Sequence, residues 1–338
     1  MIRPARSDLS TALHGFLTEY LPRQKGVSPH TLHSYRDSLK LLLRFAAGKK
    51  GDCSQLSLPQ ITNEKVVAFL HHLESDRHNQ VSTRNVRLSA IHSFFRYVGA
   101  NYPEHLAHAQ RILSIPFKRT TLRPIQHMEL SEIQAILEGI DRSMRDGRRD
   151  HVLLSFMFNT GARVSEVVGV LACDLHLETP ASVSLRGKGR KERICPLWSE
   201  TARALRSLLE EQRIALHDPC SVFLNHRGQP LTRFGVRLIL RKHVQKGAAQ
   251  LPSLRNKRLH PHSLRHSTAI YLLRSGVDLI TIANWLGHAS VNTTNRYLAI
   301  DLEAKREALA KIKQIDSPAK RTASWREDRD LIKWLESL

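Results

Sequence analysis

The chain has 338 residues, 41% of them hydrophobic, which is enough for two domains with buried cores. Lysine and arginine total 52 against 31 acidic residues, and the formal net charge of +21 favours nucleic acid as a partner. A solvated basic surface or an anionic membrane would also fit the charge. No apolar run reaches the length of a membrane span, and no apolar stretch follows the basic N-terminus. We therefore expect a cytoplasmic protein without a membrane partner.

The cysteines argue against a zinc ribbon and against a disulfide framework, because they lie far apart and form no CxxC pair. We expect core or surface thiols at Cys53, Cys173, Cys195 and Cys220.

The N-terminal part, residues 1–105, shows a helical pattern broken by turn signals. Ser28 and Pro29 fit an N-cap and a first turn, Thr62 opens another helix, and a further helix begins near Ser82. Four short helices of this kind predict a compact helical domain.

Residues 106–127 read as a basic linker, since the periodicity fades there and prolines accompany basic residues. Such a linker could let two domains close around a duplex, with Lys118, Arg119 and Arg123 near the phosphates. A merely flexible connector fits the composition equally well.

Residues 128–315 combine helices with a small β signal. Helices are predicted over 131–140 and 150–159, and strands over 182–186 and 192–196 flank a glycine-containing turn, which predicts a hairpin. Helical patterns follow to the end, including a tail at 316–338. The predicted fold class is mainly α with a small β-sheet.

Four short motifs occur in a fixed order: Asn159 to Val167 (NTGARVSEV), Gly187 to Arg193 (GKGRKER), His260 to His266 (HPHSLRH) and Leu286 to Tyr297 (LGHASVNTTNRY). Together they resemble the tyrosine recombinase, or phage integrase, family, and the resemblance covers the whole C-terminal half. It implies an N-terminal SAM-like core-binding domain and a mixed catalytic domain that cuts and rejoins DNA.

The resemblance assigns a phosphate clamp to Arg163 and Arg265. A guanidinium forks onto two nonbridging oxygens and stays charged, so the pair would stabilise the pentacoordinate phosphorane. Glu166 is expected to brace Arg163 or to cap a helix, because a carboxylate at the phosphate would repel it.

Lys188 matches the family's hairpin lysine, a general acid for the leaving 5′ oxygen, although Arg190 and Lys191 lie close by. His262 and His288 match the two histidine positions; we expect His262 to assist deprotonation of the tyrosine and His288 to donate to a nonbridging oxygen or position the nucleophile. His260 and His266 are expected in packing or backbone contacts. A metal site built from His260, His262 and His266 is the competing interpretation.

Tyr297 matches the nucleophile, with the separation from His288 that the family uses. Attack by its phenol would give a 3′-phosphotyrosyl bond and a free 5′ hydroxyl. This bond keeps the energy of the broken phosphodiester, so the resemblance implies neither metal, ATP nor any other cofactor.

The tail after Tyr297 carries an apolar face at its end that could dock into a neighbouring subunit or fold back on its own domain. The family implies a homo- or hetero-tetramer on double-stranded DNA. Integration or transposition of a mobile element is the predicted role. The alternatives are dimer resolution, a catalytically silent DNA-binding accessory protein of the same fold and a type IB topoisomerase.

Overall fold

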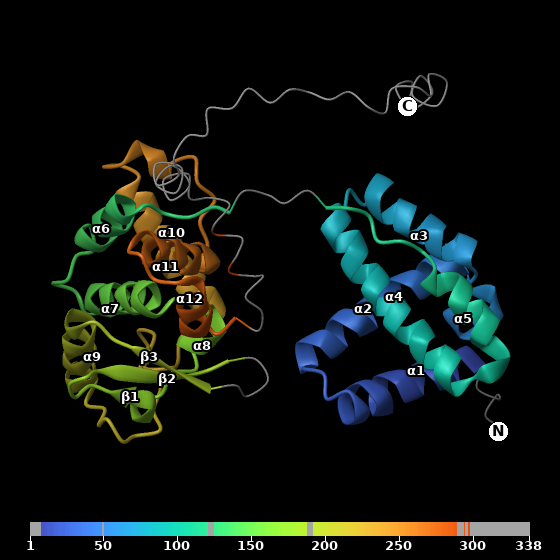
Figure 1. The fold of residues 1–338 in the computed structure, drawn as a ribbon, viewed down its shortest axis with the longest axis horizontal. Helices are drawn as coiled ribbons and strands as arrows, with labels where there is room; N and C mark the ends of the chain where they lie inside the picture. Colours follow the sequence, from blue (N-terminus) through green and yellow to red (C-terminus); the bar gives the residue numbers. More distant parts are fainter. Residues whose placement is uncertain are drawn as a thin grey trace, which may run out of the picture. The chain divides into compact units, whose positions relative to one another are not determined.

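The computed structural model describes residues 8–48, 51–120, 125–187, 192–288, 294 and 297. The chain divides into two compact units, residues 1–124 and 125–338, and each has its own hydrophobic core (Figure 1). Helices dominate both units, and a three-stranded sheet lies in the second. The predicted fold class is confirmed. No helix in the described ranges is long and apolar enough to cross a membrane.

The first unit is helical throughout, as predicted. Ser28 caps its second helix by accepting a hydrogen bond from the Thr31 backbone N–H, and Thr62 caps the third in the same way through Lys65. Both predicted helix starts are therefore confirmed. The helices of this unit are α1 (Asp8–Gly15), a π-helical turn (Phe16–Gln24), α2 (Pro29–Ala47), α3 (Asn63–Ser75), α4 (Val81–Asn101) and α5 (Leu106–Leu113).

The core of the first unit forms around α4, which contacts α2, α3 and α5. Phe94 and Phe95 on α4 are buried, and the Phe94 ring lies edge-on to Phe16 at 5.4 Å between centroids. The expected linker at 106–127 opens with α5, whose Ala109 and Ile112 join this core. That part of the segment is a packed helix, because its apolar side chains bury against the unit instead of remaining in solvent.

The remainder of the expected linker begins beside the same unit. Lys118 Nζ lies 2.8 Å from Glu74 Oε2, and its backbone pairs with the Asn85 side chain. Lys118 thus has a partner within the protein. Arg123 lies outside the described residues.

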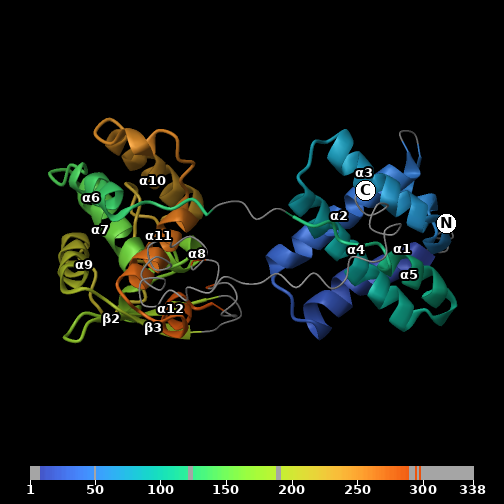
Figure 2. The same cartoon turned by 45° about the horizontal axis from the view of Figure 1, so that its top comes forward.

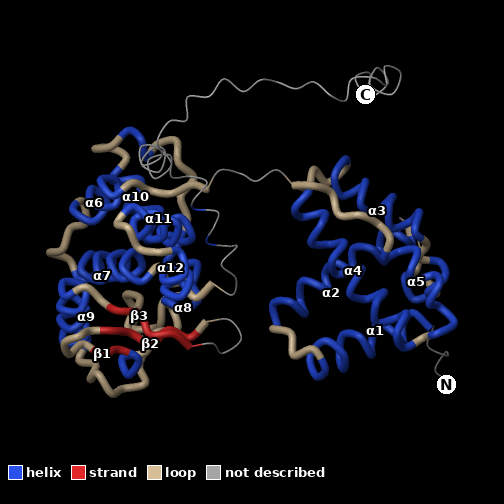
Figure 3. The backbone as a smooth tube through the Cα atoms, viewed as in Figure 1, coloured by secondary structure: helices blue, strands red, loops and turns tan. Residues whose placement is uncertain are grey.

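The second unit places helices around the small sheet. The predicted hairpin is confirmed: β2 pairs antiparallel with β3, with Val183 opposite Cys195, and β1 pairs with β2 on the other side (Figure 3). Its elements are α6 (Leu130–Glu138), α7 (Arg145–Thr160), α8 (Val164–Val167), β1 (Leu175–His176), β2 (Ser182–Arg186), β3 (Glu192–Pro196), α9 (Ser199–Gln212), α10 (Arg233–Gly247), α11 (Pro261–Arg274) and α12 (Leu279–Leu286).

The central helix of this unit is α7, which packs against α9 and α11. Asp150 on α7 is buried and bonds His243 Nε2 of α10 at 2.8 Å, which ties these two helices together. Helix α12, the last in the ranges that the structure describes, contacts both α11 and β3, and two views of the fold show it beside the strands (Figure 2). The C-terminal ends of α7 and α12 thereby come together near the hairpin. The tail at 316–338 lies outside the described residues.

Candidate active site

Two left-handed glycines shape the site. Gly161 ends α7 with φ +57° and turns the chain into Arg163, while Gly287 ends α12 with φ +62° just before His288. A Cβ on Gly161 would lie 2.4 Å from a Leu286 methyl carbon, and one on Gly287 would lie 3.1 Å from Arg193. Both turns therefore require glycine, for backbone conformation and for space.

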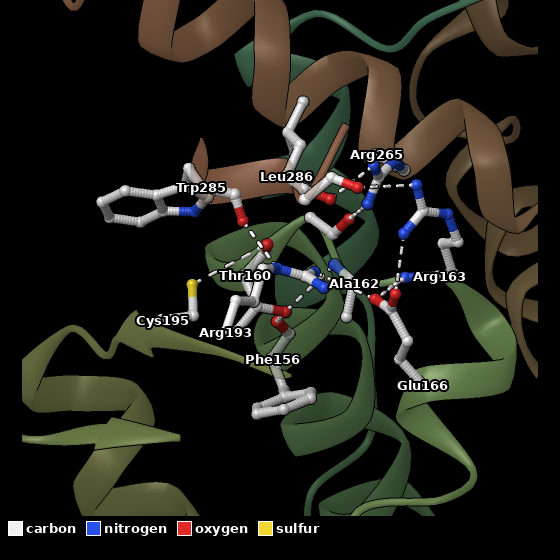
Figure 4. Close-up of polar contacts among 12 residues, drawn as sticks. Phe156, Thr160, Ala162, Arg163, Glu166, Arg193, Cys195, Arg265, Trp285 and Leu286 are labelled. Carbon is white, nitrogen blue, oxygen red and sulfur yellow. Dashed lines mark hydrogen bonds and ion pairs between the residues drawn. The ribbon is translucent and has the colours of Figure 1, made fainter. Parts of the chain in front are cut away.

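Three arginines converge on the C-terminal end of α12 (Figure 4). Arg193 Nε donates to the Trp285 carbonyl at 2.8 Å, and Arg265 Nη2 donates to the Leu286 carbonyl at 2.6 Å. Arg163 Nη2 donates to the next carbonyl, that of Gly287, at 3.0 Å. Carbonyls at a helix C-terminus lack intrahelical donors and carry the negative end of the helix dipole. One helix end thus gathers guanidinium groups from three different elements.

Arg265 is the most buried of the three, with 3% of the residue exposed. Besides Leu286 it donates through Nη1 to the Gly161 carbonyl at 2.7 Å, so it links the ends of α7 and α12. Burial and the neighbouring charge of Arg163 lower the pKa of Arg265 to about 10. It still carries its charge at neutral pH, as a phosphate ligand must.

Glu166 holds two of these arginines. Its carboxylate accepts from Arg163 Nη1 at 2.8 Å, from the Arg163 backbone N–H at 2.9 Å, and from Arg193 Nη2 at 2.9 Å. Burial would raise the pKa of Glu166, but the pairs with Arg193 and Arg163 keep it below its usual value. Glu166 therefore braces Arg163 and caps α8, as the sequence predicted.

His288 and Tyr297 stack on each other, with their ring centroids 6.3 Å apart and their planes at 15°. The Nδ1 atom of His288 lies 2.8 Å from the Thr294 hydroxyl. Partial burial and the charges of Arg265 and Arg163 lower the pKa of His288 to about 4, so its imidazole is neutral at pH 7. In the tautomer whose Nδ1 accepts from Thr294, the neutral ring carries its proton on Nε2, where it can donate to an anion.

The phenol of Tyr297 meets a histidine that the sequence interpretation did not choose. His266 Nδ1 lies 2.9 Å from the Tyr297 oxygen. The expectation that His266 serves only packing or backbone contacts is wrong, because position 266 lies one helical turn after position 262 and directs its ring at the phenol. His262 is exposed at the start of α11, and its ring centroid lies 6.5 Å from that of His266. Tyr297 itself is only 2% exposed.

The described residues thus bring together Arg163, Arg265, His288 and Tyr297, with His262 nearby. Lys188, Arg190 and Lys191 lie outside these residues. Within the described ranges, no group of three His, Cys, Asp or Glu side chains could hold a metal ion, so the alternative site of three histidines is not formed.

The sequence interpretation gave no role to Arg193, although the alternation of side chains along the predicted strand indicates that Arg193 faces inward. In β3, Glu192, Ile194 and Pro196 are exposed, whereas Cys195 is buried and the side chain of Arg193 is largely covered. Alternation in a strand therefore places Arg193 on the same face as Cys195. An inward-facing arginine beside a buried cysteine indicates a paired charge.

Family models match both units of the chain. The model of the phage integrase family covers residues 126–303, and that of the phage integrase N-terminal SAM-like domain covers residues 15–101. The chain belongs to the phage integrase family of tyrosine recombinases. The expected resemblance is confirmed on both units.

Relatives of known family are similar in sequence over most or nearly all of the chain. This recombinase is 41% identical over 333 residues to a Sinorhizobium fredii protein provisionally named integrase/recombinase y4rC, covering 98% of this chain and 99% of the relative. It is 31% identical over 298 residues to the tyrosine recombinase XerC of Pelobacter propionicus, covering 86% and 92%.

Solved structures share the fold. XerH recombinase in a post-cleavage complex with its difH substrate matches with a TM-score of 0.65 and 23% identity, covering 83% of this chain and 79% of that one. The integrase of transposon Tn1549, bound to circular intermediate DNA, also matches at 0.65, with 16% identity and coverage of 88% and 98%. At this level of identity the likeness concerns the fold alone.

Proposed function

We propose that this protein is a site-specific DNA recombinase that cleaves one strand by attack of Tyr297 on a phosphodiester. The observation that carries the proposal is the meeting of Arg163 and Arg265 on adjacent carbonyls of α12, followed directly by His288, whose ring stacks on Tyr297. Two fixed cations beside a phenol and a neutral imidazole suit phosphoryl transfer.

The reaction follows from these groups. The Tyr297 oxygen attacks phosphorus and loses its proton, the bond to the 5′ oxygen breaks, and the leaving oxygen takes up a proton. Arg163 and Arg265 stabilise the charge on the nonbridging oxygens of the phosphorane, and His288 adds a hydrogen bond through Nε2. We assign the general acid to Lys188 and assistance in deprotonation to His262.

The proposed products are a 3′-phosphotyrosyl bond and a free 5′ hydroxyl. Rejoining is the same step in reverse with another strand's 5′ hydroxyl, and it uses neither a metal ion nor ATP. Strand exchange between two duplexes then involves four subunits, and we propose a tetramer on double-stranded DNA. The integrase/recombinase name of the Sinorhizobium fredii relative supports integration of a mobile element as the role, and we propose integration or transposition.

A suicide substrate tests the proposal. The substrate carries a nick just 3′ of the scissile phosphate, so cleavage releases a short fragment that bears the 5′ hydroxyl; its loss prevents rejoining and traps the protein on DNA as a shifted band in a denaturing gel. Wild type is expected to form this band, and Tyr297→Phe is expected to lose it without losing DNA affinity, because only the nucleophilic oxygen is removed. Tyr271→Phe is the matched control. Tyr271 lies on the same helix as Arg265, and its ring packs against Phe158 and Trp198. A covalent band from Tyr297→Phe contradicts the assignment.

A further inference from the structure

Arg193 is the arginine at the end of α12 for which the proposed chemistry has no use. It comes from β3, its side chain is only 11% exposed, and its guanidinium spans two other elements: Nη2 bonds Glu166 on α8, and Nε bonds the Trp285 carbonyl on α12. Burying a charged side chain is costly unless all its partners are in place. The buried and paired guanidinium of Arg193 therefore indicates a role other than keeping the surface soluble.

We propose that Arg193 is a positioning residue for the recombination reaction, which holds the pair Arg163 and Arg265 in the geometry that receives the scissile phosphate. This inference rests on the proposed function, because the phosphate clamp is part of it.

The shared carboxylate gives the first reason. Glu166 is 2% exposed and bonds both Arg163 and Arg193, one on each carboxylate oxygen. With Arg193 in place, the negative charge of Glu166 is divided between two cations, and Arg163 keeps part of its own charge for a ligand. Without Arg193, the buried carboxylate of Glu166 pairs more strongly with the guanidinium of Arg163, which leaves less of that positive charge for the phosphate.

The helix end gives the second reason. Arg193 fixes the Trp285 carbonyl, and the next two carbonyls along the backbone are those that hold Arg265 and Arg163. Because consecutive peptide planes are joined covalently, a shift at Trp285 displaces both of the following acceptors. Arg193 therefore acts on Arg163 through Glu166 and on both clamp arginines through the Trp285 carbonyl. Lys at this position could reach only one of the two partners, since it lacks the planar fork.

The experiment compares single-turnover cleavage of two suicide substrates, one with an ordinary scissile phosphate and one with a methylphosphonate there. Replacing a nonbridging oxygen by methyl removes the charge that the clamp neutralises, so a defect in the clamp matters less on this substrate. The variants are Arg193→Gln and Arg193→Lys, with Arg163→Ala as the reference for a lost clamp. Arg186→Gln is the matched control, because Arg186 lies on the same hairpin, pairs with Asp174 and Glu192, and is 57% exposed.

On the phosphate substrate, Arg193→Gln is expected to cleave about 10- to 100-fold more slowly than wild type at unchanged DNA affinity, as for other residues that orient a reacting group. The deficit should shrink on the methylphosphonate, as it does for Arg163→Ala, and Arg193→Lys should lie between wild type and Arg193→Gln. If Arg193→Gln loses its fold, seen as the loss of a cooperative thermal unfolding transition, Arg193→Lys carries the same comparison.

Three results would overturn the inference: an Arg193 variant as fast as Arg186→Gln, a deficit equal on both substrates, or a deficit explained by weaker binding. They leave the proposed function standing, provided that wild type forms the covalent complex and Tyr297→Phe does not. If wild type forms none, or Tyr297→Phe still does, the proposed function fails, and this inference fails with it.

Discussion

The imidazole of His266 lies at hydrogen-bonding distance from the phenol of Tyr297, 2.9 Å from Nδ1 to the oxygen. Because Tyr297 is 2% exposed, its oxygen has to leave this position before it can attack a phosphorus atom. We infer that the contact with His266 belongs to the protein without DNA, where it keeps the proposed nucleophile covered.

His266→Ala should weaken the hold on the buried Tyr297 hydroxyl. One hydrogen bond contributes about 0.5–1.5 kcal/mol, which corresponds to a roughly 2- to 10-fold larger population with the Tyr297 hydroxyl exposed. The measurement is nitration of Tyr297 by tetranitromethane in the free protein, followed by mass spectrometry of its peptide. His260→Ala, at the start of the same helix, is the control. Equal nitration in all three proteins would show that the bond does not hold the tyrosine.

The two clamp arginines should differ in their effect on stability. Both Arg163→Ala and Arg265→Ala are expected to lose cleavage by at least about 10²-fold, the usual cost of removing one transition-state donor. Arg265→Ala should lower the melting temperature more than Arg163→Ala, because it leaves the buried carbonyls of Gly161 and Leu286 without their donor, at about 1–3 kcal/mol each. In Arg163→Ala the Glu166 carboxylate still has Arg193 and the backbone N–H of residue 163 as partners. Equal shifts in melting temperature for the two variants would contradict this division.

His288 should make the free protein sensitive to acid. Its pKa is about 4 in the folded chain against the usual 6.5 of a histidine, so below pH 6.5 the unfolded chain binds a proton that the folded chain does not. The free energy of unfolding then falls as the pH drops from 6.5 to 4. His288→Asn removes this contribution, and its melting temperature should fall less than that of wild type between pH 7 and pH 5. Asn at the exposed position His226 is the control and should follow wild type.

Cleavage should persist in EDTA and without nucleotide. The arginines supply the charge stabilisation that a divalent ion provides in metal-dependent nucleases, so the covalent band on a suicide substrate should be as strong in EDTA as in magnesium. A band lost in EDTA and restored by magnesium would show that the chemistry depends on a metal ion.

The sequence predicted the hairpin and the helix starts at Ser28 and Thr62, because turn and capping chemistry are local signals. The family resemblance named Arg163 and Arg265, two of the three arginines that meet at the end of α12. It did not predict which histidine faces the phenol. His262 and His266 lie one turn apart on the same side of a helix, and only the packing of the segment around Tyr297 decides between them.

The sequence interpretation missed the role of Arg193 for another reason. Within a motif rich in basic residues its charge looked interchangeable with that of its neighbours, and its partners Glu166 and Trp285 are distant in sequence. The start of α5 was missed because the prolines farther along made the whole segment from 106 look extended, whereas Ala109 and Ile112 bury against the first unit.

The left-handed turn at Gly287 also bears on how mutation can inactivate a gene for such a recombinase. Any other residue there would have to adopt a positive φ and would place its Cβ 3.1 Å from Arg193. Because Gly287 also offers its carbonyl to Arg163 and follows the carbonyl held by Arg265, one altered codon would disturb three arginines at once. A copy that keeps all its motif arginines, histidines and tyrosine can therefore be inert. The residue at position 287 therefore helps to distinguish active from inactive gene copies, in addition to the proposed nucleophile Tyr297.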